Sequence, residues 1–486
     1  MRIIRRRQVS SNIRLAVLNR SGAGRSPGRP AVAGHISPIG SEMYHAVIVA
    51  LSFVLVVVLL RLRWKVGRAL LISVVLLAAA LPARPAQLWG FLTSNWTAQP
   101  WHRAFPVQTV DLLVLVVLVN FLGAVLGEYG LSARLPAALR RLLRSRRLAL
   151  AGIPAMMGLM PTPGGIMLSA PIVKEAAAEY GMPPAQAAAI NYWFRHVWEY
   201  SFPLFPALPL MAGILGAEVG TVIVYTSYIS LASLLFGGFF LLRGFPARET
   251  GDNSGSPGAM ASLRSIAAAV WPVAAALALC TAVHMPAGAA LAVSVGLLVL
   301  VQRLRPARAW KMLKKSFDTD LLLVVISAMG YRAVLDASGA VSTISQFIAG
   351  FGLPVVVLVF LLPFLVGVIT GISSAMVGLS FPLLMEFLAP GGEIRYEMVA
   401  LAYCGGMSGM FVTPVHLCFA LSKDFFKVGF TELYRYVLPL TAAVAALVFA
   451  VALTWGRLVP RAVPAGKPRV AHEETFACHA SPLTRY

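Results

Sequence analysis

The residues with the most evident chemistry are Arg195, His196 and Glu199, which lie near the middle of the apolar stretch 185–210. Together with Tyr192 they share one helical face, because residues three and four positions apart are neighbours on a helix. Arg195 can hold a carboxylate through two parallel hydrogen bonds, and Glu199 or His196 can carry a coupling proton. Because a charge inside a bilayer costs roughly 2.5–3.5 kcal/mol on insertion scales, the cluster predicts a polar site buried in a membrane.

Two other interpretations of this stretch stay open. In the first, Arg195 and Glu199 form an intrahelical pair that only neutralises itself. In the second, neighbouring aromatic side chains form an interfacial belt, which moves the cluster toward the membrane edge. The aromatic residues are Tyr192, Trp193, Trp198 and Tyr200, and the prolines Pro203, Pro206 and Pro209 follow them. Prolines free backbone carbonyls, which are tolerated inside a membrane only beside protein or a wet cavity.

Two further apolar stretches, 148–173 and 354–389, are interrupted at PTPGG (161–165) and TGISS (370–374). Each flank is short for a full crossing, so a re-entrant hairpin is predicted in both places. Helix N-termini at such tips present N–H groups and positive dipole ends to an anion. The alternative is a tight helix contact built from small residues. The candidate residues are Thr162, Gly164, Gly165 and Ser169 in the first stretch, and Thr370, Ser373 and Ser374 in the second.

The stretch 397–421 contains the Gly-rich run 405–409 and then Thr413-Pro-Val-His416. This order predicts an unwound middle, with Ser408 and Thr413 as ligand oxygens. The alternative for the glycines is a GxxxG helix contact, and for His416 it is a structural histidine. Asn191, one helical turn before Arg195, completes the candidate set.

The composition places the chain among multi-span helical membrane proteins. It is 58% hydrophobic and 12% charged, with a mean hydropathy of +0.77, whereas soluble domains carry about 25% charged residues. The net charge of +22 does not indicate nucleic-acid binding, because the basic residues lie in short loops between spans. Four cysteines lack CxxC spacing and are interpreted as packing residues, with no disulfide framework implied. They are Cys280, Cys404, Cys418 and Cys478.

Apolar length predicts about ten membrane-crossing helices. They are expected at 44–62, 66–83, 107–127, 185–210, 218–242, 266–284, 286–302, 318–337, 397–421 and 432–456. With two hairpins added, the Arg- and Lys-rich loops all fall on the cytoplasmic side and both termini face outward. Residues 1–42 are interpreted as a disordered basic leader, with Met43 as an alternative start, and 457–486 as a disordered tail.

An internal repeat divides the membrane region. Asp111-Leu-Leu recurs as Asp320-Leu-Leu at an offset of 209 residues, and Tyr192 corresponds to Tyr403 at an offset of 211 residues. The predicted halves are 43–243 and 266–456, joined by a cytoplasmic linker at 244–265. Each half contains an odd number of crossings, which inverts the second half relative to the first, as in many secondary transporters. Asp111 and Asp320 are expected to cap helices.

The motifs MPTPGGIMLSAP (160–171), NYWFRHVWEY (191–200) and TPVHLC (413–418) resemble an uncharacterised integral-membrane "domain of unknown function" family of the ion-transporter superfamily. Divalent-anion/sodium symporters and gluconate-type and arsenite permeases are its distant relatives. The resemblance covers about 43–456. It implies two repeats with re-entrant hairpins and a site at the hairpin tips and the broken helices beside them.

The sequence therefore predicts an all-α secondary transporter for a small organic anion, in the inner (plasma) membrane. The expected partners are the lipid bilayer and the anion, Na⁺ or H⁺ is the coupling ion, and a homodimer stays open. No metal or cofactor other than Na⁺ is expected. A passive channel or exporter of the same fold is the alternative, and a membrane-embedded enzyme is a weaker one, because HExxH, GxSxG, Walker A and GxGxxG motifs are absent from the sequence.

Overall fold

The computed structural model describes residues 38–81, 104–143, 145–160, 166–245, 258–341 and 352–458, with a few isolated positions between 86 and 93. Most of the predicted leader and nearly all of the predicted tail lie outside these residues. The predicted site residues Thr162, Gly164 and Gly165 also lie outside them.

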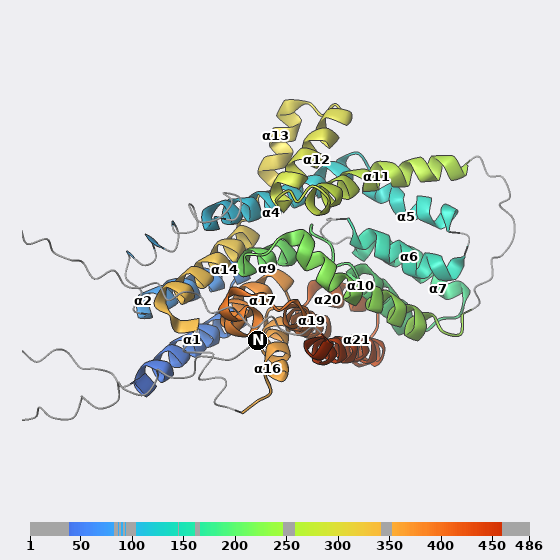
Figure 1. Cartoon of the computed structure of the whole chain (residues 1–486). Coiled ribbons are helices and arrows are strands. Elements are labelled where there is room, and N and C mark those ends of the chain that lie inside the picture. Colours follow the sequence, from blue (N-terminus) through green and yellow to red (C-terminus); the bar gives the residue numbers. More distant parts are fainter. Residues whose placement is uncertain are drawn as a thin grey trace, which may run out of the picture.

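The described residues of the first half form helices of 9 to 24 residues (Figure 1). They are α1 (Pro38–Arg61), α2 (Val66–Ala80), α4 (Phe105–Glu128), α5 (Leu131–Leu142), α6 (Arg146–Gly158), α7 (Ile166–Glu179), α8 (Pro184–His196), α9 (Ala207–Leu215) and α10 (Val219–Leu242). Most begin or end at the Gly, Pro and basic residues that separate the apolar runs, as expected for helix boundaries.

The helices of the predicted second half follow. They are α11 (Gly258–Thr281), α12 (Ala287–Val301), α13 (Pro306–Lys315), α14 (Thr319–Ser338), α16 (Val355–Thr370), α17 (Ser373–Ser380), α18 (Met385–Leu388), α19 (Tyr396–Val412), α20 (Leu417–Phe426) and α21 (Phe430–Leu458). The strongly amphipathic α13 buries no residue and projects from the rest of the molecule (Figure 1).

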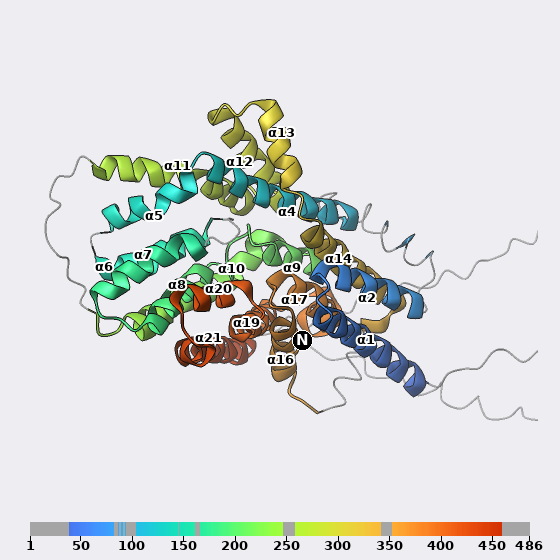
Figure 2. The same ribbon diagram turned by 180° about the vertical axis from the view of Figure 1, so that it is seen from behind.

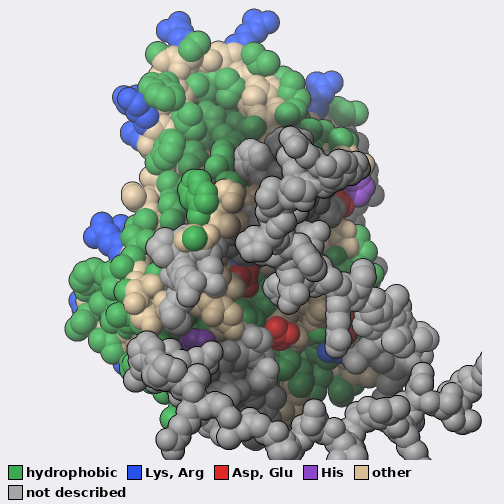
Figure 3. Space-filling model, turned by 60° about the vertical axis from the view of Figure 1, so that its left-hand side comes forward, with side chains coloured by type: hydrophobic (Ala, Val, Ile, Leu, Met, Phe, Trp, Pro, Cys, Tyr) green, Lys and Arg blue, Asp and Glu red, His purple; other side chains and the backbone are tan. Residues whose placement is uncertain are grey.

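Seven helical segments within the described ranges are long and apolar enough to cross a membrane. Many of their large apolar side chains point outward, such as Val224 and Leu235 on α10. In Figure 3, hydrophobic side chains cover the upper and left-hand part of the face in view, with Lys and Arg side chains at its edges. Exposing so many apolar side chains to water would be unfavourable, so this surface is suited to contact with lipid. The predicted all-α, multi-span membrane fold is confirmed.

Two of the predicted crossings are broken. The stretch predicted as one helix over 185–210 is α8 followed by residues 197–206 as turns and then α9, because Pro203 and Pro206 cannot continue the hydrogen-bond ladder. The predicted unwound middle of 397–421 is wrong in its position. Helix α19 is regular through Gly405 and Gly409, and the break falls at Thr413–His416.

Helix α16 explains why those glycines remain helical. A Cβ at Gly405 would collide with the carbonyl of Phe360, and one at Gly409 with the carbonyl of Phe364. The two helices therefore touch backbone to backbone, which is the GxxxG alternative foreseen for this run.

The two halves pack against each other through crossed helix pairs (Figures 1 and 2). Helix α4 packs on α12, and α14 packs on α2. Asp111 of α4 accepts hydrogen bonds from the backbone N–H groups of Gly288 and Ala289 at 3.0 Å, at the start of α12. Asp320 of α14 accepts one from Gly67 at 3.0 Å, at the start of α2. The prediction that the two carboxylates cap their own helices is therefore wrong, because each accepts from the start of a helix in the other half.

Candidate functional site

Four places where one helix ends and the next begins lie close together, although residues 161–165 between α6 and α7 are outside the described residues. They lie between α6 and α7, between α8 and α9, between α16 and α17, and between α19 and α20. A broken helix leaves backbone groups without intrahelical partners, so each interruption brings exposed dipoles to this place. Side chains from the ends of these helices connect the interruptions to one another.

The first connection joins the end of α6 to the end of α8. A Cβ at Gly158 would collide with the carbonyl oxygen of Arg195, so only glycine allows this approach. The guanidinium of Arg195 donates to the carbonyl of Met157 at 2.6 Å. Trp198 donates from its indole nitrogen to Ala155 at 2.9 Å. Arg195 is therefore held beside the interruption between α6 and α7.

The start of α7 is also held by α8. The Asn191 amide donates to the carbonyl of Ile166 at 3.2 Å, and Ser169 donates from its hydroxyl to Asn191 Oδ1 at 2.6 Å. Asn191 and Ser169 are both fully buried. Because both the oxygen and the nitrogen of the Asn191 amide have partners, this side chain positions α7 rather than facing a solute.

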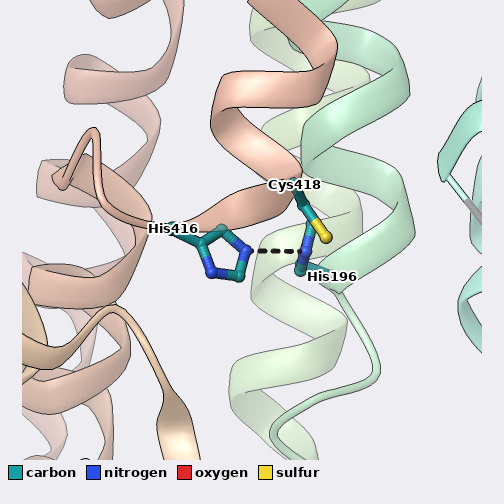
Figure 4. Close-up of side chains that lie close together, drawn as sticks. All are labelled: His196, His416 and Cys418. Atoms are coloured by element: carbon teal, nitrogen blue, oxygen red, sulfur yellow. Dashed lines mark hydrogen bonds between the residues drawn. The ribbon is translucent and has the colours of Figure 1, made fainter. Parts of the chain in front are cut away.

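The second connection joins α8 to α20, as Figure 4 shows. The Nε2 atoms of His196 and His416 lie 3.2 Å apart. Cys418, on the first turn of α20, brings its sulfur to within 4.8 Å of both rings, so the three side chains are a group that could hold a metal ion. The carboxylate of Glu199 lies 3.7 Å from His196 Nε2.

The third connection joins the interruption after α16 to the one after α19. The ring nitrogen Nδ1 of His416 lies 2.9 Å from the carbonyl oxygen of Gly371. Gly371 has a φ of 62° and closes the end of α16, a conformation that favours glycine. A Cβ there would press on the backbone nitrogen of His416 at 3.0 Å.

Two tyrosines tie α8 and α19 together in a crossed manner. Tyr192 donates from its hydroxyl to the carbonyl of Phe411 at 3.2 Å, and Tyr403 donates to the carbonyl of Glu199 at 2.8 Å. Tyr192 of α8 thus donates to a carbonyl near the C-terminal end of α19. Tyr403 of α19 donates to a carbonyl just after the C-terminal end of α8. These are the two tyrosines that the repeat places in register.

The structure brings part of the predicted residue set together. Asn191, Arg195, His196, Glu199 and His416 lie at the meeting point, and Ser169 reaches it through Asn191. Thr370 and Thr413 flank the interruptions, where Thr370 donates to Val366 and Thr413 accepts from Val415. Ser373 and Ser374 begin α17.

One predicted residue and both alternatives for the charged stretch need correction. Ser408 lies within regular α19 and donates to Cys404 at 2.7 Å, so it does not border the break. Arg195 and Glu199 cannot form an intrahelical pair, because α8 ends at His196. The aromatic belt is also wrong, because Tyr192, Trp193 and Tyr200 are buried inside the protein.

Three important residues were not selected from the sequence. Cys418 was interpreted as packing, although it follows the Thr-Pro break by only a few positions. Gly158 and Gly371 have no side chain that could bind a ligand. They matter because the absence of a Cβ lets another backbone segment approach closely. The Gly in TGISS was visible as an interruption, but its contact with His416 requires the tertiary structure.

Fold and site together define a multi-span helical membrane protein whose interrupted helices meet inside the bundle. The chain belongs to the family described as "Protein of unknown function (DUF401)", which matches residues 46–454. The predicted resemblance to a membrane family of unknown function is thereby confirmed. No curated protein matches the chain. A solved structure, that of the YdaH transporter of Alcanivorax borkumensis, is similar in fold, with a TM-score of 0.52 and 16% identity. The similarity covers 79% of this chain and 95% of that one.

Proposed function

We propose that this protein is a secondary active transporter of a small organic anion, a carboxylate, driven by Na⁺ or H⁺ across the inner membrane. The observation that carries the proposal is the meeting of four helix interruptions at Arg195 and His196. In secondary transporters, the substrate and coupling ion bind where discontinuous helices expose their termini near the membrane midplane. An interruption at this depth is otherwise unfavourable.

Arg195 gives the site its preference for an anion. Its guanidinium lies at the end of α8, beside the end of α6. Helix N-termini add partial positive charge, and α7 and α17 both begin at the interruptions. A carboxylate can accept hydrogen bonds from the guanidinium and from free backbone N–H groups at the same time. We therefore assign Arg195 as the residue that binds the anion.

The crossed contacts support an arrangement in two inverted repeats. The Asp111–Gly288 and Asp320–Gly67 hydrogen bonds relate the halves reciprocally, as do the hydrogen bonds of Tyr192 and Tyr403. The pairs α6/α7 and α16/α17 occupy corresponding places and are the proposed re-entrant hairpins. Such symmetry supplies the two alternate packings that alternating access requires.

The solved structure with a similar fold is described as a transporter, which supports the transport role. The fold similarity does not extend to a substrate, so the carboxylate is inferred from Arg195 and the helix termini. A passive channel of the same architecture would share these features. A secondary active transporter accumulates the solute against its concentration gradient, whereas a passive channel does not.

A ligand-stabilisation screen tests the anion-binding part of the proposal. The purified protein would be heated with a panel of carboxylates, with and without Na⁺, and the midpoint of unfolding measured. A ligand at 100 times its Kd should stabilise the native state by about 2.7 kcal/mol. The increase should vanish in Arg195→Ala and persist in the control Arg264→Ala, an exposed arginine of α11. Equal stabilisation of both variants would show that Arg195 does not bind the anion.

A further inference from the structure

The hydrogen-bond partners of His196 and His416 fix which ring nitrogens carry protons. His196 Nδ1 lies 2.6 Å from the carbonyl oxygen of Tyr192, and His416 Nδ1 lies 2.9 Å from that of Gly371. A carbonyl oxygen only accepts hydrogen bonds, so each Nδ1 carries a hydrogen. In the neutral rings, each Nε2 then presents a lone pair. These two Nε2 atoms lie 3.2 Å apart, and two lone pairs at this distance repel unless a positive centre lies between them.

A third donor group distinguishes a metal ion from a shared proton. A proton between the rings would use only the two nitrogens, whereas the sulfur of Cys418 also lies within 4.8 Å of both. Tetrahedral zinc with Zn–N bonds of about 2.0–2.1 Å separates two nitrogen ligands by roughly 3.3–3.4 Å. The observed separation of 3.2 Å is close to that value. Histidines that bind metal commonly donate their other N–H group to a backbone carbonyl, as both of these do.

The surroundings also fit a soft divalent cation. His196 and His416 are at most 9% exposed, and imidazole with thiolate is a donor set that suits zinc rather than Na⁺, Mg²⁺ or Ca²⁺. The guanidinium of Arg195 lies beside the Cys418 sulfur. The thiolate and the Glu199 carboxylate offset the charges of the cation and of Arg195.

We propose that His196, His416 and Cys418 bind a divalent transition-metal ion of the zinc class, with the fourth position open beside Glu199. The ion fastens the end of α8 to the start of α20, and so joins one half of the molecule to the other. This site does not depend on the identity of the transported solute, or on whether the protein transports one.

The experiment uses Co²⁺ alone as the probe on the purified full-length protein. Wild-type protein should bind one Co²⁺ per chain, with the visible absorption of tetrahedral cobalt and a near-ultraviolet thiolate-to-cobalt band. Cys418→Ser should lose the thiolate band, and His416→Gln should weaken binding at least tenfold, since even neighbours of metal ligands commonly contribute about that much. Cys280→Ser is the matched control, because Cys280 is buried on α11 in a separate part of the core, and it should keep the spectrum.

Two results would overturn the proposal. Wild-type protein that shows no tetrahedral cobalt spectrum would mean that the rings share a proton instead. A cobalt spectrum that survives both Cys418→Ser and His416→Gln would place the ion elsewhere. The spectrum of the wild-type protein alone decides between a metal ion and a shared proton. Both substitutions nearly preserve the size of the side chain, which limits their effect on folding. Zn²⁺ added in excess should displace the cobalt and remove the absorption.

Discussion

His196 and His416 are 220 positions apart in the sequence, yet their Nε2 atoms lie 3.2 Å from each other. His196 is the last residue of α8, and His416 immediately precedes α20. The contact thus joins one interrupted helix of the first half to one of the second. Any movement of one half against the other must therefore alter the surroundings of this pair. The distance between the two rings would report such a movement.

The approach of α6 to α8 should depend on Gly158. Replacement by alanine puts a Cβ into the carbonyl oxygen of Arg195, a backbone atom that cannot move aside alone. We expect Gly158→Ala to destabilise the native state by about 1–3 kcal/mol, as overpacking does, and to lower the thermal unfolding midpoint. Gly238→Ala is the control, because a Cβ at Gly238 meets nothing within 4 Å. Equal unfolding midpoints for the two variants would show that the close approach does not exist.

The crossed capping contacts predict a graded series at Asp111 and Asp320. Asp111 accepts from two backbone N–H groups and Asp320 from one. Loss of a capping side chain costs about 0.5–2 kcal/mol, so Asp111→Ala should destabilise more than Asp320→Ala. An asparagine retains one acceptor oxygen, so Asp320→Asn should remain near wild type while Asp111→Asn loses part of its stability. Chemical unfolding in detergent measures this order, and a reversed order would contradict the contacts.

Glu199 is the candidate proton carrier in the proton-coupled form of the proposal. It is 7% exposed and has His196 Nε2 at 3.7 Å. Glu199→Gln mimics a permanently protonated carboxyl group. We expect exchange of labelled for unlabelled anion to persist in this variant while uptake driven by a pH gradient is lost. Uptake that still follows the imposed pH gradient would exclude Glu199 as the coupling group.

Much of the fold could be predicted from apolar length and from Gly and Pro. The helix expected at 107–127 is α4, and that expected at 318–337 is α14, within two residues at each end. The stretch 185–210 misled the prediction because its apolar length equals one crossing. Pro203 and Pro206, which break it, were visible, but hydrophobicity alone does not distinguish a broken helix from a continuous one.

The site could be predicted only in part, because its residues come from distant segments. The charged residues of α8 stand out in an apolar sequence, whereas His416 and Cys418 each have an ordinary structural explanation when considered alone. What connects them to α8 is the contact of His196 with His416, and neither histidine gives a sign of the other in the sequence. The same limit explains why the reciprocal partners of Asp111 and Asp320 were not foreseen.

Uptake of labelled anion into proteoliposomes tests the central claim most directly, namely that the meeting point of the interrupted helices binds the transported anion. The carboxylate found by the stabilisation screen would be supplied outside vesicles with an inward Na⁺ or H⁺ gradient. We expect accumulation above the external concentration for wild type and Arg264→Ala, and no accumulation for Arg195→Ala reconstituted to the same amount. Accumulation by Arg195→Ala at the wild-type rate would contradict the claim, and uptake by wild type that only equilibrates would indicate a passive channel.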